Sequence, residues 1–193
     1  MTLTLWQWEL VPWCLFLGYW FISALRLKQT KREEPPAGRL LHIAVLVVAF
    51  NLLFARSFEF GVLALRFIPI DPALQYTGIA LTFLGVGFSI WARYCIGENW
   101  SGRVTLKIDH QLIRSGPYAY VRHPIYTGLI VACAGTALFI GEFRCLLGLI
   151  MAVIEFCRKA SKEEGFMVAE FGEIYERYRK GSGFLVPRLR RAG

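Results

Sequence analysis

Five apolar stretches separated by polar segments constrain the fold of this 193-residue chain more than any other feature. They cover approximately residues 8–25, 40–56, 76–96, 125–140 and 145–157. The chain is 55% apolar and 19% charged, whereas soluble domains are about 45–50% apolar and about 25% charged. Intrinsic disorder needs low hydrophobicity, and a disulfide-built fold does not suit five scattered cysteines. The sequence therefore predicts an all-α integral membrane protein, one domain over residues 1–193, with about five transmembrane helices.

The lengths of these stretches leave some details open. The last two are shorter than the roughly 20 residues that cross about 30 Å of hydrocarbon. The short turn at 141–144 predicts that they form an antiparallel hairpin, whose helices extend beyond the apolar residues. Residues 57–70 either cross the bilayer or fold back, and residues 26–39 are expected to form a polar linker. In the third stretch, Gly78, Gly85 and Gly87 are expected to allow a second helix to approach closely.

The positions of the basic residues predict how the chain lies in the membrane. The formal net charge is +8. If all five stretches span, all but three of the 22 Lys and Arg residues lie on the side of the C-terminus; the exceptions are Arg56, Arg66 and Arg144. The positive-inside rule then places the N-terminus outside and the C-terminus in the cytoplasm, across the inner membrane if the source is prokaryotic. This distribution explains the charge without a nucleic-acid partner, for which the sequence has no motif.

Two long polar segments, residues 97–128 and 158–191, fall on that cytoplasmic side. The first leads into the fourth apolar stretch and the second leaves the fifth. Because these two stretches form a hairpin, the polar segments must emerge side by side. A site built from the loop before the fourth span and the C-terminal helix is therefore expected, from residues about forty positions apart.

The first candidate motif is Arg122-His123-Pro124, at the start of the fourth span. A helix tolerates proline in its first turn, so Pro124 marks where that helix begins. The free N–H groups and the dipole of a helix N-terminus favour an anion, which predicts a carboxylate-binding position. The alternative is a basic interfacial anchor, in which Arg122 and His123 contact lipid phosphates.

The second candidate motif is Glu163-Glu164. A helix is predicted from Glu163 to Tyr178, because Phe171, Ile174 and Tyr178 recur on one face. By pattern alone this is a solvated amphipathic helix on the membrane surface. A carboxylate beside the positive loop would instead hold a cationic cofactor group, such as a sulfonium or its α-amino group.

Other ionisable residues are interpreted as structural. His42 is expected to be a packed or interfacial histidine, and Glu9 and Glu155 lie near predicted membrane ends. The cysteines are interpreted as small apolar residues. The sequence has no P-loop, no H-E-x-x-H and no dinucleotide fingerprint, and no metal site is predicted.

Taken together, these motifs resemble the isoprenylcysteine carboxyl methyltransferase family, most closely its short prokaryotic members. The resemblance is carried by GENWSG…HQLIRSGPYAYVRHPIYTG and KEEGFMVAEFGEIYERY…VPR. It implies a membrane-embedded enzyme that transfers a methyl group from S-adenosylmethionine without a soluble Rossmann-type domain. The best-known members methylate the C-terminal carboxylate of a prenylated cysteine. The resemblance implies a catalytic region at residues 75–191, preceded by spans one and two within residues 1–72.

The same resemblance implies which residues form the site. The implied cofactor-binding residues match the family's motif positions and are His110, Gln111, Leu112, Ile113, Tyr118, His123, Pro124, Ile125, Tyr126, Glu163 and Glu164. The resemblance also implies a catalytic cation at Lys159, with Arg158 adjacent, and Arg122 is the third cation that would meet an acceptor carboxylate. Lys159 stands where the family has an arginine, so a point charge replaces a two-pronged clamp.

This chemistry suits the residues. Methyl transfer is an in-line displacement, so the enzyme mainly aligns the acceptor and removes water from it. A carboxylate acceptor is already ionised at neutral pH and needs a cation rather than a base. The lipophilic acceptor would enter from the bilayer and the cofactor from the cytoplasm. The alternatives are a thiol, lipid amine or other lipophilic acceptor, a nicotinamide-dependent membrane reductase, and a non-enzymatic membrane scaffold.

Overall fold

The computed structural model describes residues 3–25, 30–33, 36–55, 58–97, 105–107 and 112–188. The helices are α1 (Leu5–Ala24), α2 (Pro36–Phe54), α3 (Pro72–Ile96), α4 (Pro124–Ile140), α5 (Phe143–Phe171) and α6 (Glu173–Gly181). Short 3-10 helices are η2 (Gly61–Ala64) and η4 (Gly116–Ala119). The predicted helical fold is confirmed, with one addition: strands β1 (Thr30–Glu33) and β2 (Thr105–Lys107) pair antiparallel.

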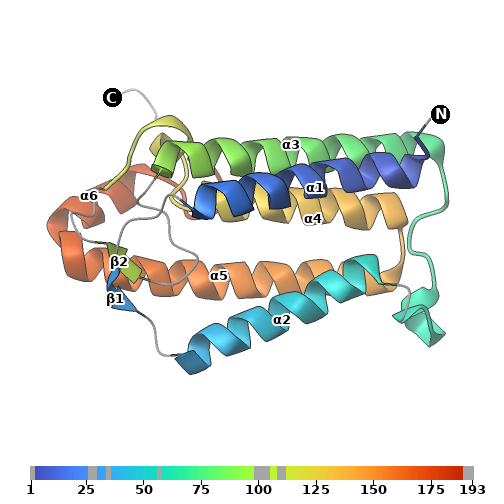
Figure 1. Cartoon of the computed structure of the whole chain (residues 1–193), viewed down its shortest axis with the longest axis horizontal. Coiled ribbons are helices and arrows are strands. Elements are labelled where there is room, and N and C mark those ends of the chain that lie inside the picture. The colour runs from blue at the N-terminus through green and yellow to red at the C-terminus, as the bar shows by residue number, and fades with distance from the viewer. Residues whose placement is uncertain are drawn as a thin grey trace.

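Successive long helices run in opposite directions (Figure 1). The ends of α1, α3 and α5 and the starts of α2 and α4 therefore gather at one end of the bundle, where α6 also lies (Figure 1). Chain reversals follow from local sequence. Gly141, at φ 73°, ends α4 in the left-handed conformation that glycine adopts readily, and α5 begins two residues later. The predicted hairpin of the fourth and fifth stretches is confirmed.

Two predicted boundaries are wrong, and one predicted extension is confirmed. The expected linker at 26–39 is shorter, because α2 already begins at Pro36, and proline suits the first turn of a helix. The helix of the fifth stretch does extend beyond the apolar residues, since α5 runs for 29 residues, Phe143–Phe171. The single helix predicted from Glu163 to Tyr178 is broken at Gly172, whose φ of 50° lets the chain turn between α5 and α6.

The region between α2 and α3 contains no spanning helix within its described residues, 58–70. It holds only the one-turn η2 and extended chain, and a backbone bridge joins Arg66 to Glu142 at the start of α5. Arg144 also closes this end of the bundle, because its Nη1 donates to the carbonyls of Leu52 (2.9 Å) and Leu53 (3.3 Å) at the end of α2. These carbonyls would otherwise lack a helical partner.

Helices α3 and α4 cross at glycines. A Cβ atom at Gly85 would lie 2.4 Å from the backbone oxygen of Gly128 and 2.4 Å from the nitrogen of Ala132. Gly78 makes a similar approach to Gly135, whereas a Cβ at Gly87 would meet open space. The predicted role is thus confirmed for Gly78 and Gly85 and wrong for Gly87.

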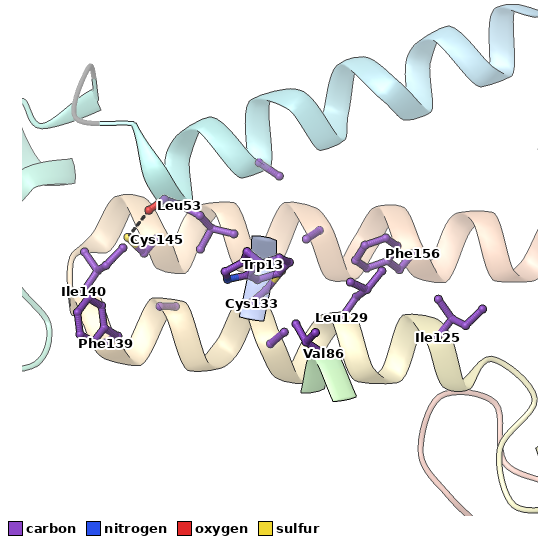
Figure 2. Packing of buried hydrophobic residues seen from close by; sticks show 14 of the residues in the cluster. Trp13, Leu53, Val86, Ile125, Leu129, Cys133, Phe139, Ile140, Cys145 and Phe156 are labelled. Atoms are coloured by element: carbon purple, nitrogen blue, oxygen red, sulfur yellow. Dashed lines mark hydrogen bonds between the residues drawn. The ribbon is translucent and has the colours of Figure 1, made fainter. Parts of the chain in front are cut away.

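Apolar side chains fill the space between α4 and α5. Figure 2 shows Trp13 of α1, Leu129 and Cys133 of α4, and Phe156 of α5 together in this core. Many other apolar side chains face outward, among them Phe21, which is 73% exposed, and Leu84, which is 67% exposed. Among the described residues, α3 is long and apolar enough to cross a membrane, while Gly38–Phe54 and Pro124–Ile140 are apolar but shorter.

Candidate active site

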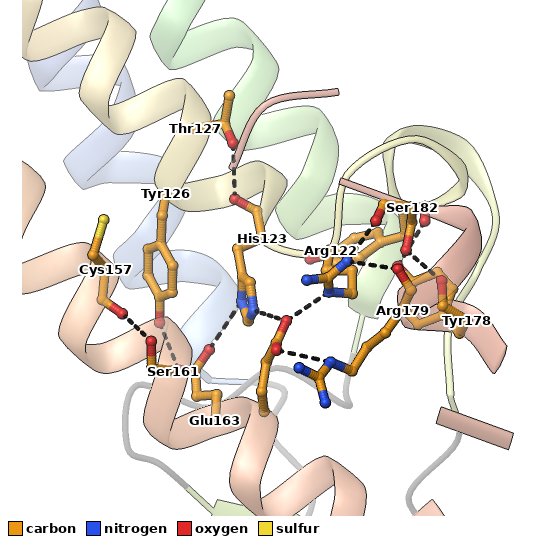
Figure 3. Close-up of polar contacts among 12 residues, drawn as sticks. Arg122, His123, Tyr126, Thr127, Cys157, Ser161, Glu163, Tyr178, Arg179 and Ser182 are labelled. Atoms are coloured by element: carbon orange, nitrogen blue, oxygen red, sulfur yellow. Dashed lines mark hydrogen bonds and ion pairs between the residues drawn. The ribbon is translucent and has the colours of Figure 1, made fainter. Parts of the chain in front are cut away.

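The two polar segments singled out in the sequence meet at one end of the bundle. The loop that contains η4 leads into α4, while α5 extends past the bundle and turns into α6 (Figure 1). His123 precedes a proline, which disfavours the helical conformation at that residue. It has φ −121° and ψ 58°, so α4 begins sharply at Pro124. The ring of His123 then points toward α5 (Figure 3).

His123 lies between the two motif glutamates. Its Nδ1 is 3.6 Å from Glu163 Oε2, and its Nε2 is 3.4 Å from Glu164 Oε1. The His123 and Glu164 side chains are largely buried, and that of Glu163 is 24% exposed. The predicted meeting of residues forty positions apart is therefore confirmed.

Arg122 joins Glu164 to the C-terminal part of the chain. Its Nε donates to Glu164 Oε1 at 2.5 Å, and its Nη1 donates to the carbonyl oxygens of Ser182 (2.5 Å) and Arg179 (3.2 Å). The Arg179 side chain reaches the other oxygen, Glu164 Oε2, at 3.3 Å. Two guanidinium groups and one histidine thus surround a single buried carboxylate (Figure 3).

Tyr126 connects the histidine to Glu163 one turn into α4. Its hydroxyl donates to Glu163 Oε1 at 2.6 Å. The Tyr126 ring lies nearly parallel to the rings of His123 and Phe156, with centroids 5.9 Å and 5.3 Å away. Three stacked rings therefore form one wall of the site between α4 and α5.

The pKa values follow from burial and from these charges. Burial lowers the pKa of His123, but Glu163 and Glu164 outweigh burial, and the net pKa is raised above 6.5. Burial raises the pKa of Glu164, but His123 and Arg122 outweigh it and bring that pKa down to about 2. The pKa of Glu163 is also lowered, because His123 and Lys159 outweigh the effect of burial. Near neutral pH both carboxylates are ionised, and the histidine gains a proton more readily than usual.

The segment after α6 crosses over the loop that carries Arg122 and His123. We call residues 182–188 the C-terminal strap. Its backbone pairs with residues 120–123: Gly183 N donates to Tyr120 O (2.9 Å), Arg122 N to Gly183 O (2.9 Å), and His123 N to Phe184 O (3.3 Å). The backbone that leads into the histidine is therefore fixed by the strap.

The other predicted cofactor residues are mostly buried around this network. Pro124 and Ile125 are buried at the start of α4, and Tyr118 is buried on η4. Burial raises the pKa of Tyr118 well above 10, so its phenol is neutral. Leu112 and Ile113 are half-buried in the preceding loop. His110 and Gln111 lie outside the described residues.

Two of the predicted cations have different surroundings. Lys159 Nζ lies 5.9 Å from the centre of the Tyr126 ring, within the network. Arg158 instead pairs with Glu155 on its own helix, its Nε 2.9 Å from Glu155 Oε2. The same carboxylate is 2.6 Å from Nδ1 of His42, so this second cluster links α5 to α2. His42, which was expected to be packed or interfacial, is packed against Glu155. Glu155, which was expected near a membrane end, is buried.

Sequence reasoning missed the residues that hold the network from the C-terminal side. These are Tyr178, whose hydroxyl donates to Tyr118 O at 2.7 Å, together with Arg179, Ser182 and Phe184. Ser182 contacts the network through its backbone carbonyl, which any residue supplies, and Phe184 contacts His123 through its carbonyl and its ring from a distant part of the chain. Sequence spacing therefore carries no signal for them.

Comparisons with known proteins match this site to a family. The model of the isoprenylcysteine carboxyl methyltransferase family matches residues 78–169, which include both motifs. The chain is 31% identical over 153 residues to a protein-S-isoprenylcysteine O-methyltransferase of Schizosaccharomyces pombe, covering 74% of this chain and 65% of that relative. It is 32% identical over 110 residues to the Homo sapiens protein of the same name, covering 55% of this chain and 39% of that relative.

A solved structure shares the fold. It is that of the eukaryotic intramembrane Ras methyltransferase, an isoprenylcysteine carboxyl methyltransferase, with a TM-score of 0.56 and 22% identity. The likeness covers 81% of this chain and 54% of that one. This chain thus spans about two thirds or less of the length of these relatives.

Proposed function

Because residues 78–169 match the model of the isoprenylcysteine carboxyl methyltransferase family, we propose that this chain is a member of that family and a membrane methyltransferase that uses S-adenosylmethionine. Its acceptor is a lipophilic molecule, most simply the C-terminal carboxylate of a prenylated cysteine. Residues 75–191 form the catalytic region. The observation that carries the proposal is the joint network of Tyr126, His123, Glu163 and Glu164, built from the two family motifs.

The residues present suit this cofactor. Nε2 of His123 is buried and makes no hydrogen bond of ordinary geometry within the described part of the chain, although Glu164 lies 3.4 Å away. A polar ligand atom would satisfy it. Glu163 is the more open carboxylate and suits an ammonium group, while the first turn of α4 suits a carboxylate. The cofactor supplies a methyl group on a positively charged sulfur.

The protein's own part is to hold the acceptor and exclude water. A carboxylate acceptor needs a cation nearby to leave water. Among the three candidates, Arg122 contacts Glu164 and the carbonyl of Ser182, and Arg158 contacts Glu155. Lys159 lies beside Tyr126 and its charge acts on Glu163. Lys159 also stands at the family's acceptor-contacting position, so we assign the acceptor contact to it first, and Arg122 and Arg158 add positive charge around it.

The same proposal includes five membrane spans, α1 to α5, with the N-terminus outside and the C-terminus in the cytoplasm. The alternating helix directions and the outward-facing apolar side chains support it. The site would then lie at the cytoplasmic boundary of the membrane. A polar cofactor reaches such a site from water, and a lipophilic acceptor reaches it from the bilayer.

Calorimetry on the detergent-purified protein tests the cofactor. We expect S-adenosylhomocysteine, the demethylated product, to bind, and His123→Ala and Glu163→Ala to weaken it at least tenfold, as expected when charge-assisted hydrogen bonds are lost. NADPH serves as the competing ligand. Binding of NADPH without binding of S-adenosylmethionine or S-adenosylhomocysteine would overturn the proposal in favour of a reductase.

A labelled methyl transfer assay tests the acceptor. A farnesylated cysteine analogue, a small thiol and a lipid amine are supplied with methyl-labelled cofactor. Label on the carboxylate of the analogue supports the proposed acceptor. Label on the thiol or the amine instead would keep the methyltransferase and replace the substrate.

A further inference from the structure

Phe184 of the C-terminal strap is in direct contact with the histidine of the site. Its ring meets the His123 ring edge-on, with centroids 5.2 Å apart and an interplanar angle of 73°. The Arg122 guanidinium carbon lies 5.8 Å from the centre of the same phenylalanine ring. Phe184 therefore contacts two of the three basic residues that face Glu164, His123 and Arg122.

The strap delivers this ring to a fixed position. The carbonyl of Phe184 accepts from His123 N at 3.3 Å, and the next carbonyl, of Leu185, accepts from the Thr127 hydroxyl at 2.7 Å. Arg188 N donates to Tyr120 O at 2.9 Å, which closes the far end of the strap. None of these bonds uses the phenylalanine side chain. The side chain can therefore be changed while the strap keeps its backbone contacts.

We propose that Phe184 is a positioning residue of the cofactor site, which holds the His123 ring against Glu163 and Glu164 and keeps water from that contact. The inference rests on the proposed function, because it adds a residue to the same site. Edge-to-face aromatic pairs prefer one geometry, so the ring restrains rotation of the imidazole. Ion pairs strengthen when water is excluded, so the ring also strengthens the contact it covers.

The charged and titratable groups around His123 come from the loop before α4 and from α4, α5 and α6. Glu163 and Glu164 face it from α5, where the charge of Lys159 acts on Glu163, and Tyr126 lies beside it on α4. Arg122 of the loop and Arg179 of α6 both reach Glu164. The strap places Phe184 against it. Admitting water weakens the effect of burial and that of the two carboxylates together. The net upward shift of the His123 pKa then shrinks toward zero.

Binding of S-adenosylhomocysteine to wild type, Phe184→Ala and Phe184→Leu gives the first readout. We expect about a tenfold loss of affinity for the alanine variant, from the lost aromatic contact and the admitted water, and a smaller loss for leucine, which still excludes water. Val186→Ala is the matched control, because Val186 lies on the same strap and is 77% exposed. Equal affinities for Phe184→Ala and Val186→Ala would overturn the proposal.

Titration of the histidines by NMR gives a second readout that needs no ligand. The chain has three histidines, so His123→Gln assigns the His123 signal. In Phe184→Ala the pKa of His123 should fall toward 6.5, while Val186→Ala should leave it unchanged; an unchanged value in both would contradict the positioning role. If wild type binds no sulfur compound, the proposed function fails, and this titration still decides whether Phe184 positions His123.

Discussion

Two buried glutamates of this protein, Glu9 and Glu164, have opposite surroundings. Glu9 lies inside the bundle, fully buried, where its Oε1 accepts from the hydroxyls of Thr136 (2.6 Å) and Thr82 (2.9 Å). Trp13 Nε1 donates to Thr136 Oγ1 at 3.0 Å, so the cluster joins α1, α3 and α4. Glu164 is also buried, but its partners are Arg122, Arg179 and His123.

The comparison shows that the partners decide what a buried acid does. Neutral hydroxyls from α3 and α4 make the Glu9 cluster a packing contact that fixes the positions of three helices. Cations from the loop before α4 and from α6 keep Glu164 ionised and create a charged site at the helix ends. The bundle interior therefore depends on shape and hydrogen bonds, and the end of the bundle depends on charge.

The largest expected effect is on the charged side of this comparison. Arg122→Ala leaves Glu164 buried with one cation fewer, and such a change costs about 3–5 kcal/mol of unfolding free energy. Arg179→Ala is the control, since its side chain is 40% exposed and contacts the same carboxylate. It should cost under about 1 kcal/mol. Denaturant unfolding in detergent measures both, and equal losses would show that Arg122 does not hold the network.

The pH dependence of stability comes next in size. The folded pKa of Glu164 is about 2, below its ordinary 4.5, so its contribution is complete above pH 4.5 and is lost as the pH falls toward 2. The shift corresponds to roughly 3 kcal/mol at most. The folded pKa of His123 is raised above 6.5, so its contribution is complete below pH 6.5 and is lost as the pH rises through the folded value.

The free energy of unfolding, measured across pH, separates these two contributions. The loss below pH 4.5 is the acid limb of the profile, and the loss above pH 6.5 is its alkaline limb. Glu164→Gln should flatten the acid limb, and His123→Gln should flatten the loss above pH 6.5. Glu9→Gln should leave the acid limb as in wild type. A change in the acid limb for the Glu9 variant would show that the two regions are coupled electrostatically.

Close packing sets the next effect, in the bundle interior. Gly85→Ala places a methyl group 2.4 Å from backbone atoms of α4 that cannot move aside cheaply, and should cost about 2–3 kcal/mol. Gly87→Ala, two residues away, meets open space and should be neutral or slightly stabilising, because alanine favours helices. Thermal unfolding of the pair tests this, and similar melting temperatures would contradict the close crossing of α3 and α4.

The smallest expected effect distinguishes hydrogen bonding from charge at Glu9. Glu9→Gln keeps an oxygen for both threonine hydroxyls and should cost under about 1 kcal/mol, whereas Glu9→Ala leaves them unsatisfied and should cost about 2 kcal/mol. Equal costs for the two variants would mean that Glu9 acts through its charge. The Glu9 cluster would then depend on charge, as the Glu164 network does.

Much of the site was predictable because its two motifs are local patterns on a predictable hairpin. Pro124 marks the helix start, and Glu163 follows the end of the fifth apolar stretch, so their proximity follows from connectivity. The hydrogen bonds of Glu9 were not predictable, since Thr82 and Thr136 lie 73 and 127 positions away. The pairing of His42 with Glu155 was not predictable either, because it depends on how α2 packs against α5.

The sequence by itself determined the helical membrane-type composition, the order of the apolar stretches, their close-packing glycines Gly78 and Gly85, and the two motifs. These are properties of local pattern and of spacing along one chain. Only the tertiary structure decided that Arg122 holds Glu164 and Ser182 together, and that the strap covers His123 with Phe184. Those contacts run through backbone carbonyls and long-range packing, and they exist only once the chain has folded back on itself.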